Sequence, residues 1–211
     1  MLTIGTAGWN VPKGYADVFP SIESHLERYA RRVDGVEINT SFYRPHRVAT
    51  YARWAAATPN HFRFAVKVPR TITHMQRLEH ADALLRKFLC EVAGLGPLLV
   101  QLPPSLRFDD RASAAFLRTF RDVHGGRIVR EPRHASWLAP DVDALLADLR
   151  IARVAADPAP APGADEPGGW PGLRYYRLHG SPKIYYSAYE ARALDTLALR
   201  LAEDAVQGCE S

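Results

Sequence analysis

The chain has 211 residues, of which 47% are hydrophobic and 24% are charged, a composition typical of a soluble globular protein. The formal net charge is +4, which suits an anionic ligand but is far from the charge of a polybasic tail. No apolar stretch is long enough to cross a bilayer, and the N-terminus does not read as a secretory leader, so we expect a cytoplasmic protein with no membrane partner.

Extended and helical segments alternate along the chain. Hydrophobic periodicity predicts strands at residues 2–7, 36–39, 62–68, 97–101, 127–131, 151–155 and 174–178. It predicts helices at residues 21–33, 48–57, 81–93, 110–123, 141–149 and 189–205, the first of them capped by Ser21. Residues 158–172 are rich in proline, alanine and glycine, and we expect a long loop there within a single domain covering 1–211.

The chain contains two cysteines, Cys90 and Cys209. Cys90 falls within an apolar helical run, so we expect a buried free thiol rather than half of a disulfide. No cysteine spacing typical of a metal site occurs. Reduced cysteines agree with a cytoplasmic location.

Alternation of strand and helix indicates parallel strands joined by right-handed crossovers. Successive strand ends lie roughly 30 residues apart, which predicts an α/β fold of the TIM-type (β/α) barrel class with about seven strands visible. An eighth strand would begin near residues 208–211, so the barrel is either open or the sequence is shorter than the natural protein. The alternative is a doubly wound open sheet, although no glycine-rich phosphate fingerprint is present.

Residues 36–47 begin as a strand and end as a polar, aromatic loop. Glu37 and Asn39 alternate with Val36 and Ile38, so the two polar side chains share one face. A carboxylate at the end of an apolar strand is costly to bury without a partner. We therefore expect the polar residues at other strand ends to supply those partners.

In a barrel of this class the functional site lies at the carboxyl ends of the strands. Polar residues at or just past these ends are Glu37, Asn39, Lys67, Gln101, Glu131, Arg133, Asp157, Arg177 and His179. The loops beyond them add Tyr43, Arg44, His134 and Tyr186 as candidate ligand-binding residues.

These residue types point to acid–base chemistry on an anion. Glu37, Glu131 or Asp157 could act as a general base, and His179 could donate or accept a proton, as could the less favoured His134. Lys67, Arg133 and Arg177 could hold a phosphate or carboxylate, and Asn39 and Gln101 could add hydrogen bonds. Lys67 could also form a Schiff base, although nothing in the sequence marks its pKa as lowered.

Other readings remain open. Paired glutamates and arginines can act only as structural plugs at a barrel end. Glu37, Glu131, Asp157 and His179 together could bind a divalent metal, although no metal-type spacing supports it. The positive net charge and the loops that carry arginine and tyrosine would also suit a nucleic-acid-binding protein or a metal-assisted phosphodiesterase.

Several ordered motifs resemble those of the YecE-like family, a domain of unknown function. They are residues 4–9 (IGTAGW), 36–44 (VEINTSFYR), 64–69 (FAVKVP), 101–105 (QLPPS), 131–134 (EPRH) and 177–180 (RLHG). The resemblance implies a TIM-type barrel and no established activity. Family members usually carry an aromatic residue where this chain has Pro132, and an eighth strand with an asparagine-rich motif.

We expect an enzyme, a hydrolase or an isomerase, that acts on a small anionic or phosphorylated, sugar-like ligand at the mouth of the barrel. A barrel that binds a ligand or partner without turnover is the remaining possibility.

Overall fold

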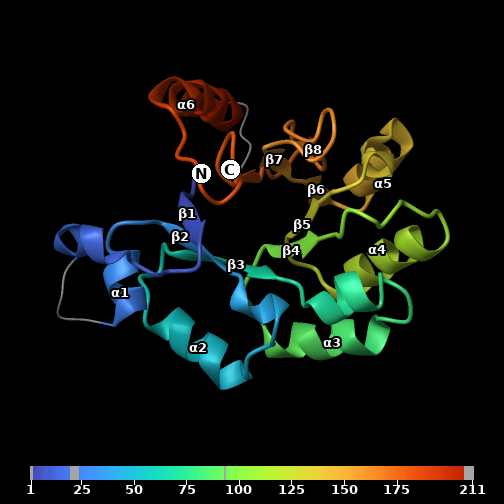
Figure 1. The fold of residues 1–211 in the computed structure, drawn as a ribbon. Helices are drawn as coiled ribbons and strands as arrows, with labels where there is room; N and C mark the ends of the chain where they lie inside the picture. Colours follow the sequence, from blue (N-terminus) through green and yellow to red (C-terminus); the bar gives the residue numbers. More distant parts are fainter. Residues whose placement is uncertain (1, 20–23, 93, 207–211) are drawn as a thin grey trace.

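The computed structural model describes residues 2–19, 24–92 and 94–206. Its framework is a mainly parallel seven-stranded sheet with helices along it (Figure 1). The strand order is β1 (Gly5–Ala7), β2 (Gly35–Ile38), β3 (Arg63–Lys67), β4 (Leu98–Gln101), β5 (Ile128–Glu131), β6 (Ile151–Arg153) and β8 (Gly168–Gly169). Strands β1 to β6 are parallel to their neighbours, and β8 runs antiparallel to β6. The predicted α/β class is therefore confirmed.

A second sheet continues the chain beyond β6. Strand β7 (Ala155–Asp157) follows β6 after Val154 alone and pairs in parallel with β9 (Tyr176–Leu178). Within the described ranges β9 does not pair with β1, so no closed barrel is seen there. Residues 207–211, where an eighth strand was expected to begin, lie outside the described residues.

Two details of the strands differ from the prediction. The segment predicted as one strand over 151–155 is divided at Val154, because β6 pairs with β5 and β8 whereas β7 pairs with β9. Strand β8 lies within the predicted loop 158–172. Gly169 there has φ of +64°, and a Cβ atom on it would lie 2.5 Å from the Ile151 carbonyl oxygen. Only glycine suits that combination of backbone angle and close approach.

All six predicted helices are present, and most of their ends differ from the prediction by one or more residues. They are α1 (His25–Ala30), α2 (Val48–Ala56), α3 (Asp82–Glu91), α4 (Ala112–Val123), α5 (Pro140–Asp148) and α6 (Ala191–Val206). The expected cap Ser21 lies outside the described residues, and Ser24 caps α1 in a reciprocal arrangement with Glu27. Short turns of helix occupy η1 (Lys13–Val18), η2 (Thr40–Phe42), η3 (Thr71–Met75) and η4 (Ala135–Leu138). None of the described helices is long and apolar enough to span a membrane.

The expectation that Cys90 is buried was wrong. Its thiol is free and exposed, because α3 turns Leu85 and Phe88 toward the core and Cys90 away from it. Cys209 lies outside the described residues.

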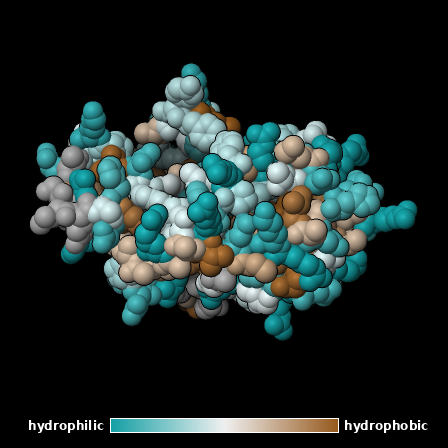
Figure 2. All heavy atoms as spheres, turned by 90° about the horizontal axis from the view of Figure 1, so that it is seen from below, coloured by the Kyte–Doolittle hydropathy of each residue, from teal (hydrophilic) through white to brown (hydrophobic). Residues whose placement is uncertain are grey.

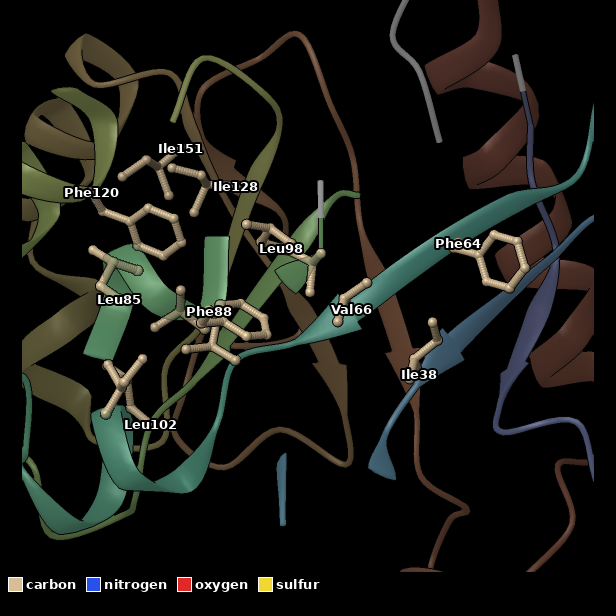
Figure 3. Close-up of a cluster of buried hydrophobic side chains, with 14 of the residues drawn as sticks. Ile38, Phe64, Val66, Leu85, Phe88, Leu98, Leu102, Phe120, Ile128 and Ile151 are labelled. Atoms are coloured by element: carbon tan, nitrogen blue, oxygen red, sulfur yellow. The ribbon is translucent and has the colours of Figure 1, made fainter. Parts of the chain in front are cut away.

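Alternate residues of the strands face two separate apolar clusters. The larger cluster fills the space between the sheet and the helices (Figure 3), and includes Ile38, Phe64, Val66, Leu98, Ile128 and Ile151 from the strands. A smaller cluster on the opposite face of the sheet contains Leu99, Val129, Ala152, Val154 and Leu173. This second, inner face also carries the polar strand-end residues described below.

The helices are distributed unevenly. Helices α2 and α3 lie on one side of the sheet, whereas α6 lies apart from them, beyond β1 (Figure 1). On the face seen from below, hydrophilic side chains surround small separate groups of hydrophobic ones (Figure 2). Leu194 and Leu199 of α6 are exposed, so this helix packs less completely than α3 or α4.

Truncating a side chain in the larger cluster should destabilise the fold. Leu98 is fully buried, so we expect Leu98→Ala to lower the free energy of unfolding by about 2–5 kcal/mol through lost burial and a residual cavity. Leu199→Ala is the matched control, because Leu199 is 70% exposed and the change should cost less than about 0.5 kcal/mol. Urea unfolding measures both variants, and equal losses would contradict this description of the core.

Candidate functional site

Strand register places polar side chains from several strands on the inner face of the sheet. Residues paired across parallel strands point to the same side, and Gln101 pairs with Glu131 while Ala156 pairs with Arg177. Glu37 of β2 pairs with Ala65 of β3, and Lys67 lies two residues beyond Ala65 on β3. Strand alternation therefore turns Glu37, Lys67, Gln101, Glu131 and Arg177 toward one space.

A single guanidinium group shows how strongly the sheet curves. Glu37 and Glu131 belong to β2 and β5, three strand spacings apart, which would separate them by about 14 Å in a flat sheet. Arg177 from β9 nevertheless contacts both carboxylates. The inner face is therefore concave, and it brings residues of β2, β5 and β9 into contact.

Arg177 binds Glu37 through two hydrogen bonds. Its Nε donates to Glu37 Oε2 at 3.0 Å, and its Nη2 donates to Oε1 at 2.8 Å. The hydroxyl of Tyr175 donates to Oε2 at 3.1 Å. Burial, followed by the Glu37 charge, raises the pKa of Tyr175 well above its ordinary value, so the phenol keeps its proton and remains a donor.

Glu131 is fully buried and receives more donors than Glu37. Arg177 Nη1 and Arg133 Nη1 both donate to it, the latter at 3.0 Å, and Gln101 Nε2 lies 3.1 and 3.0 Å from its two oxygens. His179 Nε2 lies 3.7 Å from Oε1. Burial alone would raise the pKa of Glu131, but His179 and the two guanidinium groups hold it at about 2.

This pKa decides the role that Glu131 can play. A carboxylate that stays ionised near neutral pH, with both oxygens occupied by donors, is a poor general base. It is well placed to orient Arg133, Arg177 and His179. Both oxygens of Glu37 are likewise occupied by donors, from Arg177 and Tyr175.

Lys67 has a different environment. Its side chain is 7% exposed, and Nζ lies 4.2 Å from the centre of the Phe42 ring. Burial and then the charge of Arg177 lower the pKa of Lys67 from 10.5 to about 8, against the opposing effect of Glu37 and Glu131. Lys67 therefore changes protonation state close to neutral pH, unlike Glu131.

A cavity of about 90 Å³ opens beside this network. Arg133 and His179 line it together with Ala156, Ile184 and Tyr185, and with the prolines and Ala159 of the loop after β7. Arg133 Nε is buried and has no hydrogen-bond partner among the described residues. A buried donor without a partner is costly, so Arg133 retains hydrogen-bonding capacity that no described residue uses.

Asp157 is not brought to this space. It pairs with Leu178, and both residues alternate with the inward-facing Ala156 and Arg177. Asp157 lines a separate cavity of about 250 Å³ between strands β7 and β9 and helix α6, together with Tyr176 and Tyr189. The backbone oxygen of Asp157 accepts a hydrogen bond from the backbone N–H of His179 at 2.7 Å.

The remaining predicted residues lie at the rim. Asn39 begins η2 and makes no capping hydrogen bond through its side chain. Tyr43, Arg44 and Tyr186 are exposed, and Lys183 Nζ lies 4.3 Å from the ring centre of Tyr186. His134 instead caps η4: its Nδ1 accepts from Ser136 N at 3.1 Å.

The sequence analysis missed three residues that shape the site. Tyr175 lies two residues before Arg177, so strand alternation places both side chains on the same face. Ser41 is fully buried, and its Oγ lies 2.8 Å from Ile38 O and 2.7 Å from Lys67 O, joining the ends of two strands. Phe42 contacts Lys67, which no periodicity indicates.

The proposed set of metal ligands does not come together. Within residues 2–19, 24–92 and 94–206, no three histidine, cysteine, aspartate or glutamate side chains are grouped to hold a metal ion. The guanidinium of Arg177 lies between Glu37 and Glu131.

Removing the charge of Glu131 should change the acid sensitivity of the protein. The pKa of Glu131 lies below its unfolded value of about 4.3, so its ionised form stabilises the fold fully above that pH and progressively less as the pH falls toward 2. We expect Glu131→Gln to cost about 3 kcal/mol at pH 7, since two guanidinium groups lose their partner. That deficit should shrink between about pH 4 and 2 in urea unfolding.

Glu166→Gln is the control for this experiment. Glu166 pairs with Arg200 at 2.9 Å but its side chain is 56% exposed, so the change should cost less than about 1 kcal/mol. A pH-independent deficit in Glu131→Gln would contradict the assigned ionisation.

Comparison with known proteins assigns the chain to a family. The profile described as "Protein of unknown function DUF72" matches residues 3–210. The UPF0759 protein YecE of Escherichia coli K12 is 39% identical over 101 residues, which are 48% of this chain and 36% of that protein. The match thus spans about a third of the length of this relative.

Two crystal structures have similar folds. A DUF72 family protein from Thermotoga maritima has a TM-score of 0.78 at 22% identity, covering 100% of this chain and 90% of that one. A DUF72 family protein from Enterococcus faecalis has a TM-score of 0.78 at 21% identity, with 100% and 86% covered. With the match of the family profile over nearly the whole length, the chain belongs to the DUF72 family of proteins of unknown function.

Proposed function

We propose that the protein is an enzyme that binds a small anionic ligand, phosphorylated or sugar-like, where the strand ends meet, and acts on it by acid–base chemistry. The curved sheet would form most of a TIM-type (β/α) barrel, whose active sites lie at the same position. The observation that carries the proposal is the buried, unpartnered Nε of Arg133 beside a cavity that also contains His179.

The charges of the site favour an anion. The network contains two carboxylates, Glu37 and Glu131, and three cationic side chains, Lys67, Arg133 and Arg177. Arg177 neutralises much of the glutamate charge, which leaves Arg133 and Lys67 available for a ligand. A guanidinium group suits phosphate and carboxylate because it donates two parallel hydrogen bonds.

His179 is the residue best placed to move a proton. It lines the cavity, and Glu131 lies within 3.7 Å of its Nε2. A carboxylate beside an imidazole orients the ring and stabilises its charged form. In this scheme Glu131 positions His179 and Arg133 and does not itself accept the proton.

Substitution of Arg133 tests ligand binding. We expect millimolar inorganic phosphate or a sugar phosphate to raise the melting temperature of the protein. Arg133→Gln should weaken that binding by about 10- to 100-fold, because it removes a charged hydrogen-bond donor. Arg118→Gln, an exposed change on α4, is the control and should leave binding unchanged. Equal stabilisation in Arg133→Gln and the wild type would refute the proposed subsite.

A second candidate, a protein that binds single-stranded nucleic acid, is favoured by the exposed aromatic rings near the opening. Tyr43, Tyr185 and Tyr186 are 72%, 76% and 79% exposed, and Lys183 accompanies Tyr186. Exposed rings with adjacent cations are the features on which bases stack. A metal-assisted phosphodiesterase would in addition require Glu37 and Glu131 to exchange Arg177 for metal ions.

Salt dependence distinguishes this second function. If a labelled single strand binds through these rings, its affinity should fall steeply with salt, and Tyr186→Ala should cost about 1–3 kcal/mol of binding energy. Tyr15→Ala, which alters another exposed ring, on η1, is the control. No binding in fluorescence anisotropy at low salt would remove this candidate.

A further inference from the structure

We infer that Lys67 is the amine nucleophile of this site and forms a Schiff base with the carbonyl carbon of a small substrate that also carries an anionic group. This inference rests on the proposed function and names the substrate class for it. The reacting atom would be Nζ, at the carboxyl end of β3.

The backbone around Lys67 is fixed. Ser41 Oγ lies 2.7 Å from the Lys67 carbonyl oxygen and 2.8 Å from that of Ile38, and Ser41 is fully buried. The next residue, Phe42, places its ring beneath Nζ at 4.2 Å. Ser41 thus fixes the backbone of Lys67, and Phe42 packs against the end of its side chain. A covalent site requires such rigid support.

Nζ itself is uncommitted. No hydrogen bond or ion pair in the described part of the chain ties it to an acceptor, although Glu37 and Glu131 are close enough to affect its charge. Both glutamates are already bound to Arg177, which explains why neither captures the ammonium group. Nζ is not one of the fully buried polar atoms that lack a hydrogen-bond partner, so it retains contact with solvent.

Burial is the main factor that favours the free amine of Lys67. Burial and then Arg177 lower its pKa, Glu37 and Glu131 raise it, and Arg133 lowers it again by a smaller amount. The ring of His74 packs edge-on against the ring of Phe42. Burial and then the charge of Lys67 lower the pKa of His74, so it is neutral near pH 7. A desolvated lysine beside other cations is the recognised environment of a nucleophilic amine.

The reaction is balanced without a further reactant. The lone pair of the neutral amine forms a bond to the carbonyl carbon, and the carbonyl oxygen takes a proton to give a carbinolamine. The nitrogen loses its second proton, and the hydroxyl group leaves as water once protonated, which forms the C=N bond. The same cations, Arg133 and Arg177, would hold a carboxylate or phosphate elsewhere on the substrate.

Reductive trapping tests this inference on the wild-type protein. The chain has only four lysines, at positions 13, 67, 87 and 183, so peptide mass mapping assigns every adduct. The probe is glyoxylate, an aldehyde that carries a carboxylate, with cyanoborohydride at pH 7.5. We expect Lys67 to be labelled at least about tenfold faster than Lys87, since far more of its amine is unprotonated at this pH.

Two further measurements sharpen the test. The rate at Lys67 should reach half its maximum near pH 8. Acetaldehyde, which lacks the carboxylate, should label Lys67 with less preference than glyoxylate does. Lys67→Met should remove the fast phase, and Lys87→Met should leave it unchanged.

The outcomes separate this inference from the proposed function. Labelling spread evenly over the four lysines, or absent from Lys67, would overturn the Schiff base. If phosphate still stabilised the protein through Arg133 in that case, the anion site would stand without covalent chemistry. Loss of both effects would refute the two together.

Discussion

The site depends on one buried ion-pair network, in which Arg177 lies between Glu37 and Glu131. Two carboxylates on the inner face of a sheet would repel each other and lose their hydration. The guanidinium group offsets both effects because its planar fork donates to each carboxylate at once. The network also joins β2, β5 and β9, strands that do not pair with one another, and so fixes the curvature of the sheet.

The network divides the polar residues into two groups. Both glutamates are saturated with donors, and Glu131 remains ionised, so their role is to hold and orient their neighbours. Lys67 and Arg133 keep atoms without partners, and the cavity lies beside Arg133. Residues with unused hydrogen-bonding capacity in a protein interior are the ones that a ligand can engage. We therefore propose that the residues held in place by the glutamates bind the ligand and react with it, and that the glutamates themselves do not.

Much of this arrangement could be predicted from the sequence. Alternating apolar residues located the strands, and counting along them placed Glu37, Lys67, Gln101, Glu131 and Arg177 at strand ends on the inner face. Asp157 shows where position at a strand end is not enough: it alternates with the inward-facing Ala156, so its side chain faces the other side of the sheet. The sequence also gives no distances, so it did not distinguish a glutamate with several donors from one free to accept a proton. That difference depends on packing between residues far apart in the chain.

The long separation between the partners in this network has a consequence for biosynthesis. Glu37 and Arg177 are 140 residues apart, and Glu131 and Arg177 are 46 apart. While the ribosome is still making the region before β9, both carboxylates lack the cation that balances them, so the emerging sheet gains nothing by burying them. The final curvature must therefore form after most of the chain has been synthesised, because contacts between distant residues form late.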